Sequence, residues 1–324
     1  MAGKETRRLP DEPLSDMSLQ QTPSFMQRLR ERWAATGSLL CVGIDPELER
    51  LPKAVRGGHT GMLALDHEAQ GSQTEGALVT FNQAIIDATA DLVCAFKPNS
   101  AFYEAYGLAG MRALIRTVTY IHSRYPDVPV ILDAKRGDIG STSAAYARAT
   151  FDVIGADAVT LQPYLGQEAV QPFLDNRAHG CFILCRTSNP GSGEFQELLV
   201  RPDHTDPARR TVVEEPLYVR LAQQVATRWN ARGNCGLVVG ATYPTELRRV
   251  RSVVGDVPIL VPGIGAQGGD LDATLRAGLD SHGRGLIISV TRSIIYASNG
   301  LDFAMQARRE AQRLIAEINR LRRA

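Results

Sequence analysis

The stretch DAKRGD at residues 133–138 combines side chains that could carry out chemistry at a carbon atom. It places Lys135 between two carboxylates, Asp133 and Asp138. Asp133 and Lys135 are two positions apart, so they share one face if this stretch is a strand. Asp138 is expected to hold the Lys135 ammonium charged and in place. A lysine that donates a proton to carbon must be charged and held in position, so Lys135 is the first candidate catalytic residue.

Two more charged residues, Asp45 and Lys97, follow the apolar runs that precede this stretch. If the runs are parallel strands of one barrel, their carboxyl ends meet on one face, and all four charges converge there. A plainer alternative is an ion-pair network that only seals the mouth of the barrel, since charges removed from water must pair. Further polar residues at predicted strand ends are Gln162 and Ser188.

A candidate anion site lies near the end of the chain. The stretch VPGIGAQGG at 261–269 offers backbone N–H groups at its glycines, and SVTRS at 289–293 brings Arg292 to the start of a short helix. Loops after the seventh and eighth strands are the usual phosphate site of such barrels. A glycine-rich turn alone could be merely a tight turn, but the arginine one strand later favours phosphate.

Eight short apolar runs rich in β-branched residues recur along the chain, and segments with helical periodicity separate most of them. This alternation predicts a parallel sheet covered by helices, and eight units fit a closed (β/α)8 barrel of the α/β class. A doubly wound sheet is the alternative, because strand order is invisible in a sequence. The predicted strands are 38–44, 92–97, 129–135, 156–161, 180–185, 235–240, 257–262 and 285–290. The predicted helices are 24–35, 78–91, 108–124, 142–154, 215–231, 245–253, 271–277 and 301–323.

We expect one domain, the barrel at 24–324, preceded by a flexible leader at 1–23. Barrels of about this length form single domains. Two stretches with few regular signals, 55–76 and 189–214, are predicted to be loop insertions. The second follows the fifth strand, so it would lie on the face where barrel active sites form. It is a candidate lid, although a surface spacer is the alternative.

Composition argues against several classes of protein. The 36 basic residues nearly balance the 35 acidic ones, so no overall positive charge would attract nucleic acid. The apolar runs are too short to cross a membrane, and the charged N-terminus has no apolar core of a secretory signal, which favours the cytoplasm. The five cysteines lie in strand-like runs and the six histidines form no metal motif, so we expect reduced core cysteines and no metal site.

Six motifs together resemble orotidine 5′-phosphate decarboxylase, specifically its longer bacterial type. They lie in the family's order between residues 40 and 296, and DxKxxD followed by Ile is the most specific of them, although a related phosphosugar decarboxylase family shares its core. The motifs are LCVGIDP (40–46), FKPNSAFYEAYG (96–107), VILDAKRGDIGST (130–142), TSNPGS (187–192), VPGIGAQGG (261–269) and TRSI (291–294).

The resemblance implies decarboxylation of orotidine 5′-monophosphate to uridine 5′-monophosphate, the last step of de novo pyrimidine synthesis, without metal or organic cofactor. It further implies a homodimer in which Asp138 and Thr142 reach into the partner subunit's site. Lys135 would protonate carbon 6, Asp133 would face the substrate carboxylate, and Asp45 and Lys97 would bind ribose hydroxyls. Ser188 would contact the pyrimidine and Gln267 would bridge base and phosphate. The phosphate would be held by Arg292 and by the backbone near Pro262, Gly263 and Thr291, where Thr291 departs from the family's frequent glycine.

In the resembled mechanism, loss of carbon dioxide leaves a carbanion in the plane of the ring. No conjugated electron sink reaches that carbanion, so a preorganised cation such as the Lys135 ammonium must stabilise it. Two other functions stay open: a magnesium-dependent sugar-phosphate decarboxylase or epimerase of the same barrel group, and a non-catalytic nucleotide-binding barrel. Sensitivity to a chelator would identify the first, and binding without turnover the second.

Overall fold

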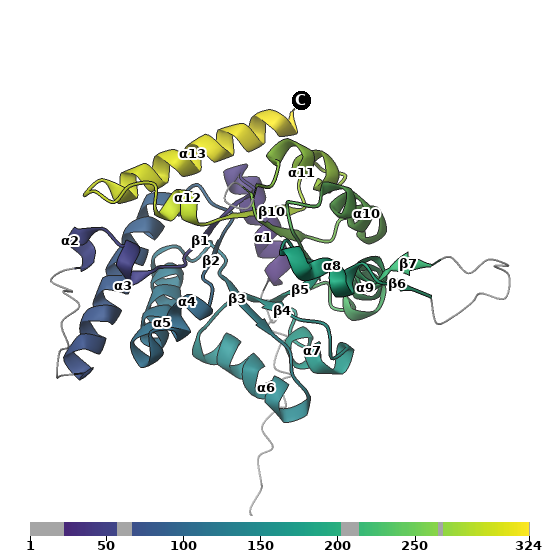
Figure 1. The fold of residues 1–324 in the computed structure, drawn as a ribbon, viewed down its shortest axis with the longest axis horizontal. Coiled ribbons are helices and arrows are strands. Elements are labelled where there is room, and N and C mark those ends of the chain that lie inside the picture. The colour runs from purple at the N-terminus through teal and green to yellow at the C-terminus, as the bar shows by residue number, and fades with distance from the viewer. Residues whose placement is uncertain (1–22, 57–66, 202–213, 265–267, 324) are drawn as a thin grey trace, which may run out of the picture.

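The strands of this protein form a closed barrel. The computed structural model describes residues 23–56, 67–201, 214–264 and 268–323. Eight parallel strands are hydrogen-bonded in the order β2-β1-β10-β9-β8-β5-β4-β3, and parallel bridges Phe96–Val130 and Asn99–Asp133 join β2 to β3. The predicted (β/α)8 barrel is therefore confirmed (Figure 1). The barrel strands are β1 (Leu40–Gly43), β2 (Ala95–Lys97), β3 (Ile131–Arg136), β4 (Ala158–Leu161), β5 (Gly180–Arg186), β8 (Cys235–Val239), β9 (Ile259–Pro262) and β10 (Leu286–Val290).

Helices cover the outside of the barrel, as Figure 1 shows. Every predicted helix is present, and π-helical turns at Ala149–Val153 and Val225–Trp229 extend two of them. None of the described helices is both long and apolar enough to cross a membrane. The longer helices are α1 (Phe25–Thr36), α3 (His67–Thr89), α5 (Gly107–Arg124), α6 (Gly140–Arg148), α7 (Gln167–Leu174), α9 (Leu217–Gln224), α10 (Pro244–Val254), α11 (Leu271–Gly278) and α13 (Phe303–Arg322).

Both predicted loop insertions contain regular structure. Helix α3 begins at His67, so the second half of 55–76 is helical, and α2 (Lys53–Arg56) lies at its start. In the second insertion, helix α8 (Gly193–Gln196) precedes strand β6 (Leu199–Val200), which pairs antiparallel with β7 (Glu215–Pro216). Residues 57–66 and 202–213, like residues 1–22 of the predicted leader, lie outside the described residues.

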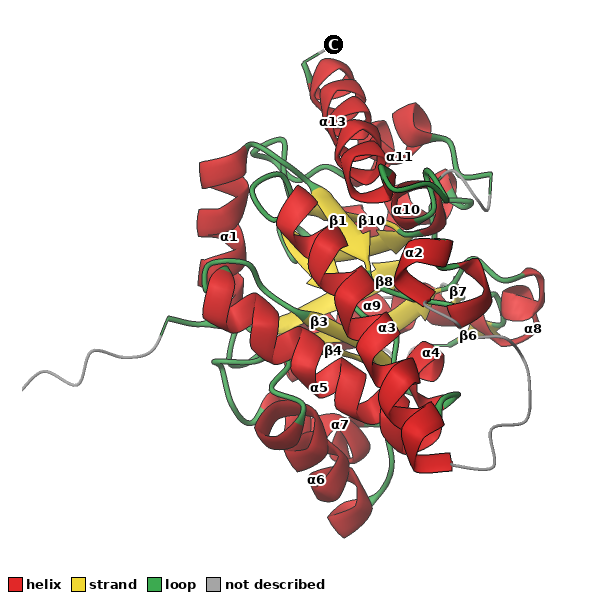
Figure 2. Ribbon diagram, turned by 90° about the vertical axis from the view of Figure 1, so that its left-hand side faces the viewer, coloured by secondary structure: helices red, strands yellow, loops and turns green. Residues whose placement is uncertain are grey.

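Helix α1 closes the amino-terminal end of the barrel. Figure 2 shows it at the opposite end from α2, α4 (Ala101–Glu104) and α8. Phe25 lies over Gly180, where any Cβ would collide with its ring, and its ring also meets Phe182 edge-on. Arg28 binds Asp157 at 2.7 Å, and the same carboxylate accepts the Val130 N–H. The other end of the barrel, where the strands finish, is thus left for a site.

Candidate active site

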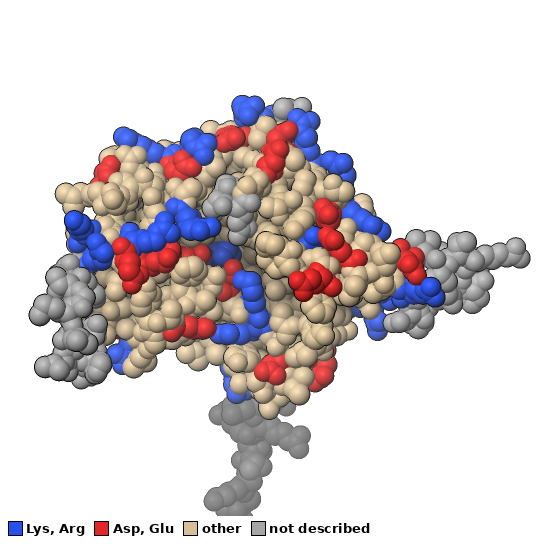
Figure 3. All heavy atoms as spheres, in the orientation of Figure 1, with Lys and Arg blue, Asp and Glu red and all other residues tan. Residues whose placement is uncertain are grey.

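A cavity of about 540 Å³ opens at the carboxyl ends of the strands. In Figure 3 this face has a hollow near its centre in which acidic and basic side chains are visible. The predicted site residues at the cavity wall come from the ends of six strands or the loops after them: Asp45, Lys97, Asp133, Lys135, Ser188, Pro262, Gly263, Thr291 and Arg292. The convergence that the sequence predicted is therefore present.

Three of these side chains form a chain of alternating charge. Lys97 Nζ lies 3.0 Å from Asp133 Oδ2, and Lys135 Nζ lies 2.7 Å from Asp133 Oδ1. The Lys97 and Asp133 side chains are 6% and 14% exposed, whereas that of Lys135 is 51% exposed. Asp45 extends the group, and its Oδ1 accepts the Asn99 N–H at 3.0 Å. Lys135 is thus the member of the chain that a substrate can reach.

The buried charges stabilise one another's ionised forms. Burial alone would raise the pKa of Asp133, but Lys97 and Lys135 outweigh it and hold that pKa well below its ordinary value. Burial likewise works against the Lys97 ammonium, yet Asp133 and Asp45 raise its pKa above the usual range. At Asp45 burial dominates, with a smaller contribution from Asp133, and the pKa is raised. Asp133 and Lys97 are therefore an ionised pair at neutral pH.

Lys135 has an uncommon backbone conformation. Its φ of +48° is the one positive value at a non-glycine residue in the described ranges. A side chain in this left-handed region costs roughly 1–3 kcal/mol and persists only where the surroundings enforce it. The conformation coincides with a register shift between β3 and β4, from Leu132 to Arg136. Strand β3 therefore departs from regular geometry at the residue proposed for the chemistry.

Asp138 does not meet the expectation that it holds Lys135 within one chain. Its Oδ1 accepts the N–H of Ile139, and the carboxylate that contacts Lys135 is Asp133. The reason is geometric, because the chain leaves β3 after Arg136 and turns into α6. Asp138 is partly exposed and Thr142 is exposed, and both are absent from the cavity wall. Their predicted contact with a partner subunit's site stays a prediction.

The opposite wall of the cavity can receive an anion. The Arg292 side chain is exposed and makes no ion pair or hydrogen bond within the part of the chain that the structure describes. It begins the short helix α12 (Arg292–Ile295), and Gly263, with φ +101°, follows β9. Gln267 lies outside the described residues. A free guanidinium beside backbone amides suits a phosphate group.

Thr291 stands where the resembled family often has glycine. Its side chain fits because the residue beside it is Gly43. The φ of Thr291 is −123°, so the position does not demand glycine. Its side chain occupies space beside Gly43, where any Cβ would collide with Thr291 Oγ1. The Thr291 hydroxyl also hydrogen-bonds to Asp45. This hydrogen bond connects the wall that carries Arg292 to the wall that carries the charged chain.

The segment after β5 is fixed by a fully buried arginine. Arg186 bonds to Ser192 Oγ and to Glu197 Oε1, and its guanidinium stacks 3.7 Å from the centre of the Tyr243 ring. Gln196 bonds twice to Thr187, to its N–H at 2.8 Å and to its hydroxyl at 2.9 Å. These contacts hold the segment that carries Ser188 against the cavity.

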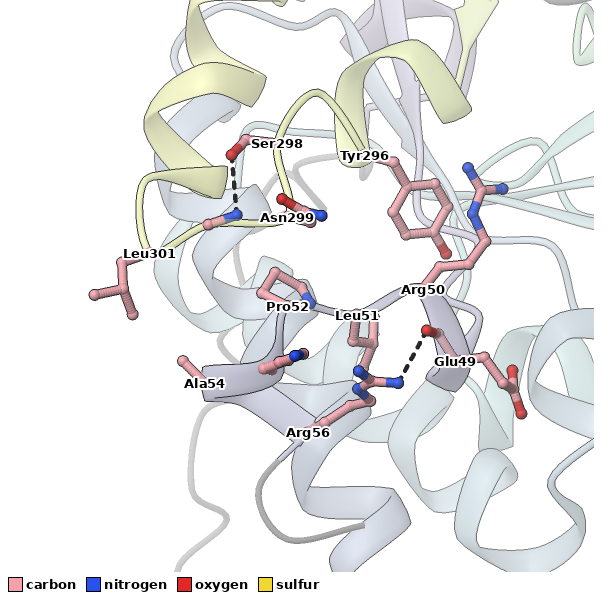
Figure 4. A pocket seen from close by; sticks show the side chains of 12 residues that line it. Glu49, Arg50, Leu51, Pro52, Ala54, Arg56, Tyr296, Ser298, Asn299 and Leu301 are labelled. Atoms are coloured by element: carbon pink, nitrogen blue, oxygen red, sulfur yellow. Dashed lines mark hydrogen bonds between the residues drawn. The ribbon is translucent and has the colours of Figure 1, made fainter. Parts of the chain in front are cut away.

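A second cavity, of about 720 Å³, is lined by residues within 49–56 and 296–301 (Figure 4). Arg50 lies over the Tyr296 ring at 4.0 Å and pairs with Glu47. The Tyr296 hydroxyl accepts the Glu47 N–H at 2.7 Å and donates to the Asp45 carbonyl at 3.3 Å. This cavity is larger, but the described residues that line it form no chain of alternating charge. Through Tyr296, the wall of this second cavity contacts the backbone of Asp45.

Sequence reasoning missed several polar residues at the cavity wall: Asn99, Thr160, Asn189 and Gln196. Asn99 and Asn189 lie inside motifs already quoted, FKPN and TSNP, so a signal was available for them. Gln162, placed among the strand-end residues, instead bonds to the Gly137 carbonyl at 2.9 Å. Within the described ranges, no group of three His, Cys, Asp or Glu side chains gathers as a metal site would require.

Comparisons with known proteins agree with this geometry. Residues 38–306 match the family model described as "Orotidine 5'-phosphate decarboxylase / HUMPS family". Proteins named orotidine 5′-phosphate decarboxylase from Herpetosiphon aurantiacus and Thermomicrobium roseum are 49% and 50% identical; the alignments cover 89% and 93% of this chain and 95% and 96% of theirs.

Solved structures show the same relationship. The structure of Leishmania donovani OMP decarboxylase has a TM-score of 0.73 at 35% identity, covering 93% of this chain and 100% of that one. The chain also matches 57% of the longer L. donovani UMP synthase, with 93% of its own residues, a TM-score of 0.75 and 38% identity. This chain therefore belongs to the orotidine 5′-phosphate decarboxylase / HUMPS family.

Proposed function

We propose that this protein converts orotidine 5′-monophosphate to uridine 5′-monophosphate and carbon dioxide, the last step of de novo UMP synthesis. The observation that carries the proposal is the Lys97–Asp133–Lys135 chain of charges on one wall of a cavity whose other wall holds Arg292, a guanidinium with no ion pair among the described residues. Relatives named for this activity match nearly the whole chain. The cytoplasmic location stays a prediction from the sequence.

In the proposed reaction, the bond from carbon 6 to the carboxylate breaks and its electron pair stays on carbon 6. The Lys135 ammonium gives that carbon a proton, and the resulting amine regains one from solvent. Asp133 faces the departing carboxylate, and the Lys97 and Lys135 cations stabilise the negative charge as it moves. The exposed position of Lys135, with the buried Asp133 behind it, supports this assignment.

The other predicted site residues bind substrate groups that do not react. Asp45 and Lys97 take the ribose hydroxyls, and Ser188 contacts the pyrimidine. Arg292 holds the phosphate together with the backbone near Pro262, Gly263 and Thr291, and Gln267 bridges base and phosphate. Binding energy from the distant phosphate then contributes to the chemical step by fixing the reacting group against Lys135.

The proposal includes a homodimer in which Asp138 and Thr142 reach the partner subunit's site. Its support is an exposed apolar surface around these two residues, in the segments after β3 and β4. Large apolar side chains so exposed favour burial against another protein surface. Among them are Tyr164 at 83%, Ile139 at 60% and Leu165 at 46%.

The test is the ultraviolet absorbance of orotidine 5′-monophosphate incubated with the purified protein, with and without a chelator. We expect conversion to uridine 5′-monophosphate at the same rate in both samples. Loss of conversion on chelation would instead indicate a metal-dependent decarboxylase. Binding without conversion by the folded protein would indicate a non-catalytic nucleotide-binding barrel.

A further inference from the structure

The hydroxyl of Thr160 connects Asp133 and Lys135, two neighbouring residues of the charged chain. Thr160 lies in β4, is 1% exposed and lines the active-site cavity. Its Oγ1 donates to Asp133 Oδ1 at 2.9 Å and accepts the backbone N–H of Lys135 at 3.0 Å. One oxygen atom thus contacts both the carboxylate and the backbone of the lysine proposed for proton transfer.

The register of the sheet explains why a side chain is needed at this point. Leu132 pairs with Val159 and Arg136 with Leu161, so Asp133, Ala134 and Lys135 lie opposite the single residue Thr160. Such a bulge interrupts the backbone ladder and leaves N–H groups without a strand partner. The Thr160 hydroxyl supplies the acceptor for Lys135 that the backbone of β4 does not. This contact helps to hold Lys135 at its positive φ.

The same hydroxyl fixes the Asp133 carboxylate. Asp133 Oδ1 receives both Thr160 Oγ1 and Lys135 Nζ, while Oδ2 receives Lys97 Nζ at 3.0 Å. The two lysine side chains are flexible, whereas a buried β-branched threonine in a strand has few rotamers. Thr160 is therefore the rigid member among the three donors.

We propose that Thr160 is a positioning residue whose hydroxyl sets the orientation of the Asp133 carboxylate and of Lys135 relative to the substrate. The proposal rests on the proposed function. It predicts a specific kinetic pattern, because the phosphate side of the cavity, at Gly263 and Arg292, has no contact with Thr160 among the hydrogen bonds of the described residues. Loss of the hydroxyl should therefore reduce turnover more than binding.

The experiment compares wild type with Thr160→Val, which keeps the shape without the hydroxyl, and Thr160→Ser, which keeps the hydroxyl. Thr160→Ala makes the same comparison as Val if the Val variant does not fold. The matched control is Thr89→Val, since Thr89 is also buried, its hydroxyl donates to the Ile85 carbonyl, and it does not line the cavity. For each protein, kcat and KM, the dissociation constant of uridine 5′-monophosphate and the melting temperature are measured.

We expect kcat of Thr160→Val to fall about 10- to 100-fold, because small displacements of reacting groups have effects of this size. KM and the UMP dissociation constant should stay within about threefold of wild type, and Thr160→Ser should recover most of kcat. Thr89→Val should lower the melting temperature without changing kcat per folded site.

Three results would overturn the assignment. The first is a wild-type kcat in folded Thr160→Val. The second is an equal loss in Thr160→Val and Thr160→Ser, which would show that the hydroxyl does not matter. The third is a lowered melting temperature with kcat per folded site unchanged, which would make Thr160 merely structural. If wild type itself does not convert orotidine 5′-monophosphate, the proposed function fails, and the role of Thr160 fails with it.

Discussion

At the scale of single residues, Lys135 is the side chain on which the proposed chemistry depends. Replacing it with Ala removes the proton donor and one of the two cations beside Asp133, so we expect turnover to fall by about four orders of magnitude. The fold should persist, because the side chain is half exposed. Steady-state turnover and the melting temperature of Lys135→Ala measure both effects. The matched control is Lys53→Ala, because Lys53 is exposed and lies outside the active-site cavity. Near-normal turnover of folded Lys135→Ala would contradict the proposal.

Arg292 should act on binding. Its guanidinium has no protein partner among the described residues, so its removal should change the stability of the fold little. A bound phosphate would lose a charged hydrogen-bond donor. Hydrogen bonds to charged groups correspond to about a 10- to 100-fold change in affinity. Titration of Arg292→Ala with uridine 5′-monophosphate should show this loss, whereas Arg276→Ala, an arginine on the outer helix α11, should bind as wild type. Unchanged affinity in Arg292→Ala would remove it from the site.

At this scale the sequence drew attention to the charged residues of the cavity wall but missed Thr160. Asp45, Lys97, Asp133 and Lys135 were found because an ionised side chain at the end of an apolar strand is conspicuous. Thr160 was not, since a β-branched residue inside a strand resembles any core position. Its role comes from a change of register between two strands far apart in the sequence, and no local pattern records that change.

At the scale of elements, Asp157 joins three parts of the fold at the end of the barrel opposite the site. It binds Arg28 of α1 at 2.7 Å, His122 of α5 at 2.9 Å and the N–H of Val130 before β3 at 2.8 Å. Burial alone would raise the pKa of Asp157, but His122 and Arg28 together lower it below the ordinary value. The folded state therefore favours the ionised carboxylate.

This lowered pKa gives a pH dependence of defined sign. The folded pKa lies below the unfolded value of about 3.9, so the stabilisation is complete above that value and is lost as pH falls through the folded pKa. At pH 7 we expect Asp157→Asn to lower the free energy of unfolding by about 2 kcal/mol. Urea unfolding at several pH values should show this difference narrowing in acid. Asp175→Asn, at an exposed carboxylate, is the control; a difference independent of pH would contradict the assignment.

Elements with strong patterns were predicted, and those with weak patterns were missed. The eight strands are short, apolar and β-branched, which distinguishes them from their surroundings. Helix α7 was missed because it has eight residues and contains Pro172, a residue that usually ends helices. Its buried residues have helical spacing, but a stretch of eight residues is too short for that spacing to predict a helix. These residues are Ala169, Val170, Phe173 and Leu174.

At the scale of the whole molecule, one chain contains a nearly complete charged site but leaves Asp138 outside it. Asp138 bonds to the N–H of Ile139, and Ile139, Tyr164 and Leu165 expose apolar surface nearby. In a twofold dimer the same surface of both chains forms the interface. The Asp138 of each chain would then approach the cavity of the other chain. A single sequence could suggest this arrangement only through family resemblance, because no pattern of spacing encodes a contact between two copies.

Mixing two inactive variants tests whether the site is shared. In a heterodimer of Lys135→Ala and Asp138→Ala chains, one site carries both defects and the other carries neither. Random pairing of equal amounts should therefore restore about a quarter of wild-type activity. Lys135→Ala mixed with Asp133→Ala is the control, since each site of that heterodimer keeps one defect within its own chain. Recovery in the first mixture alone would establish that Asp138 acts across the interface, whereas no recovery in proven heterodimers would confine Asp138 to its own subunit.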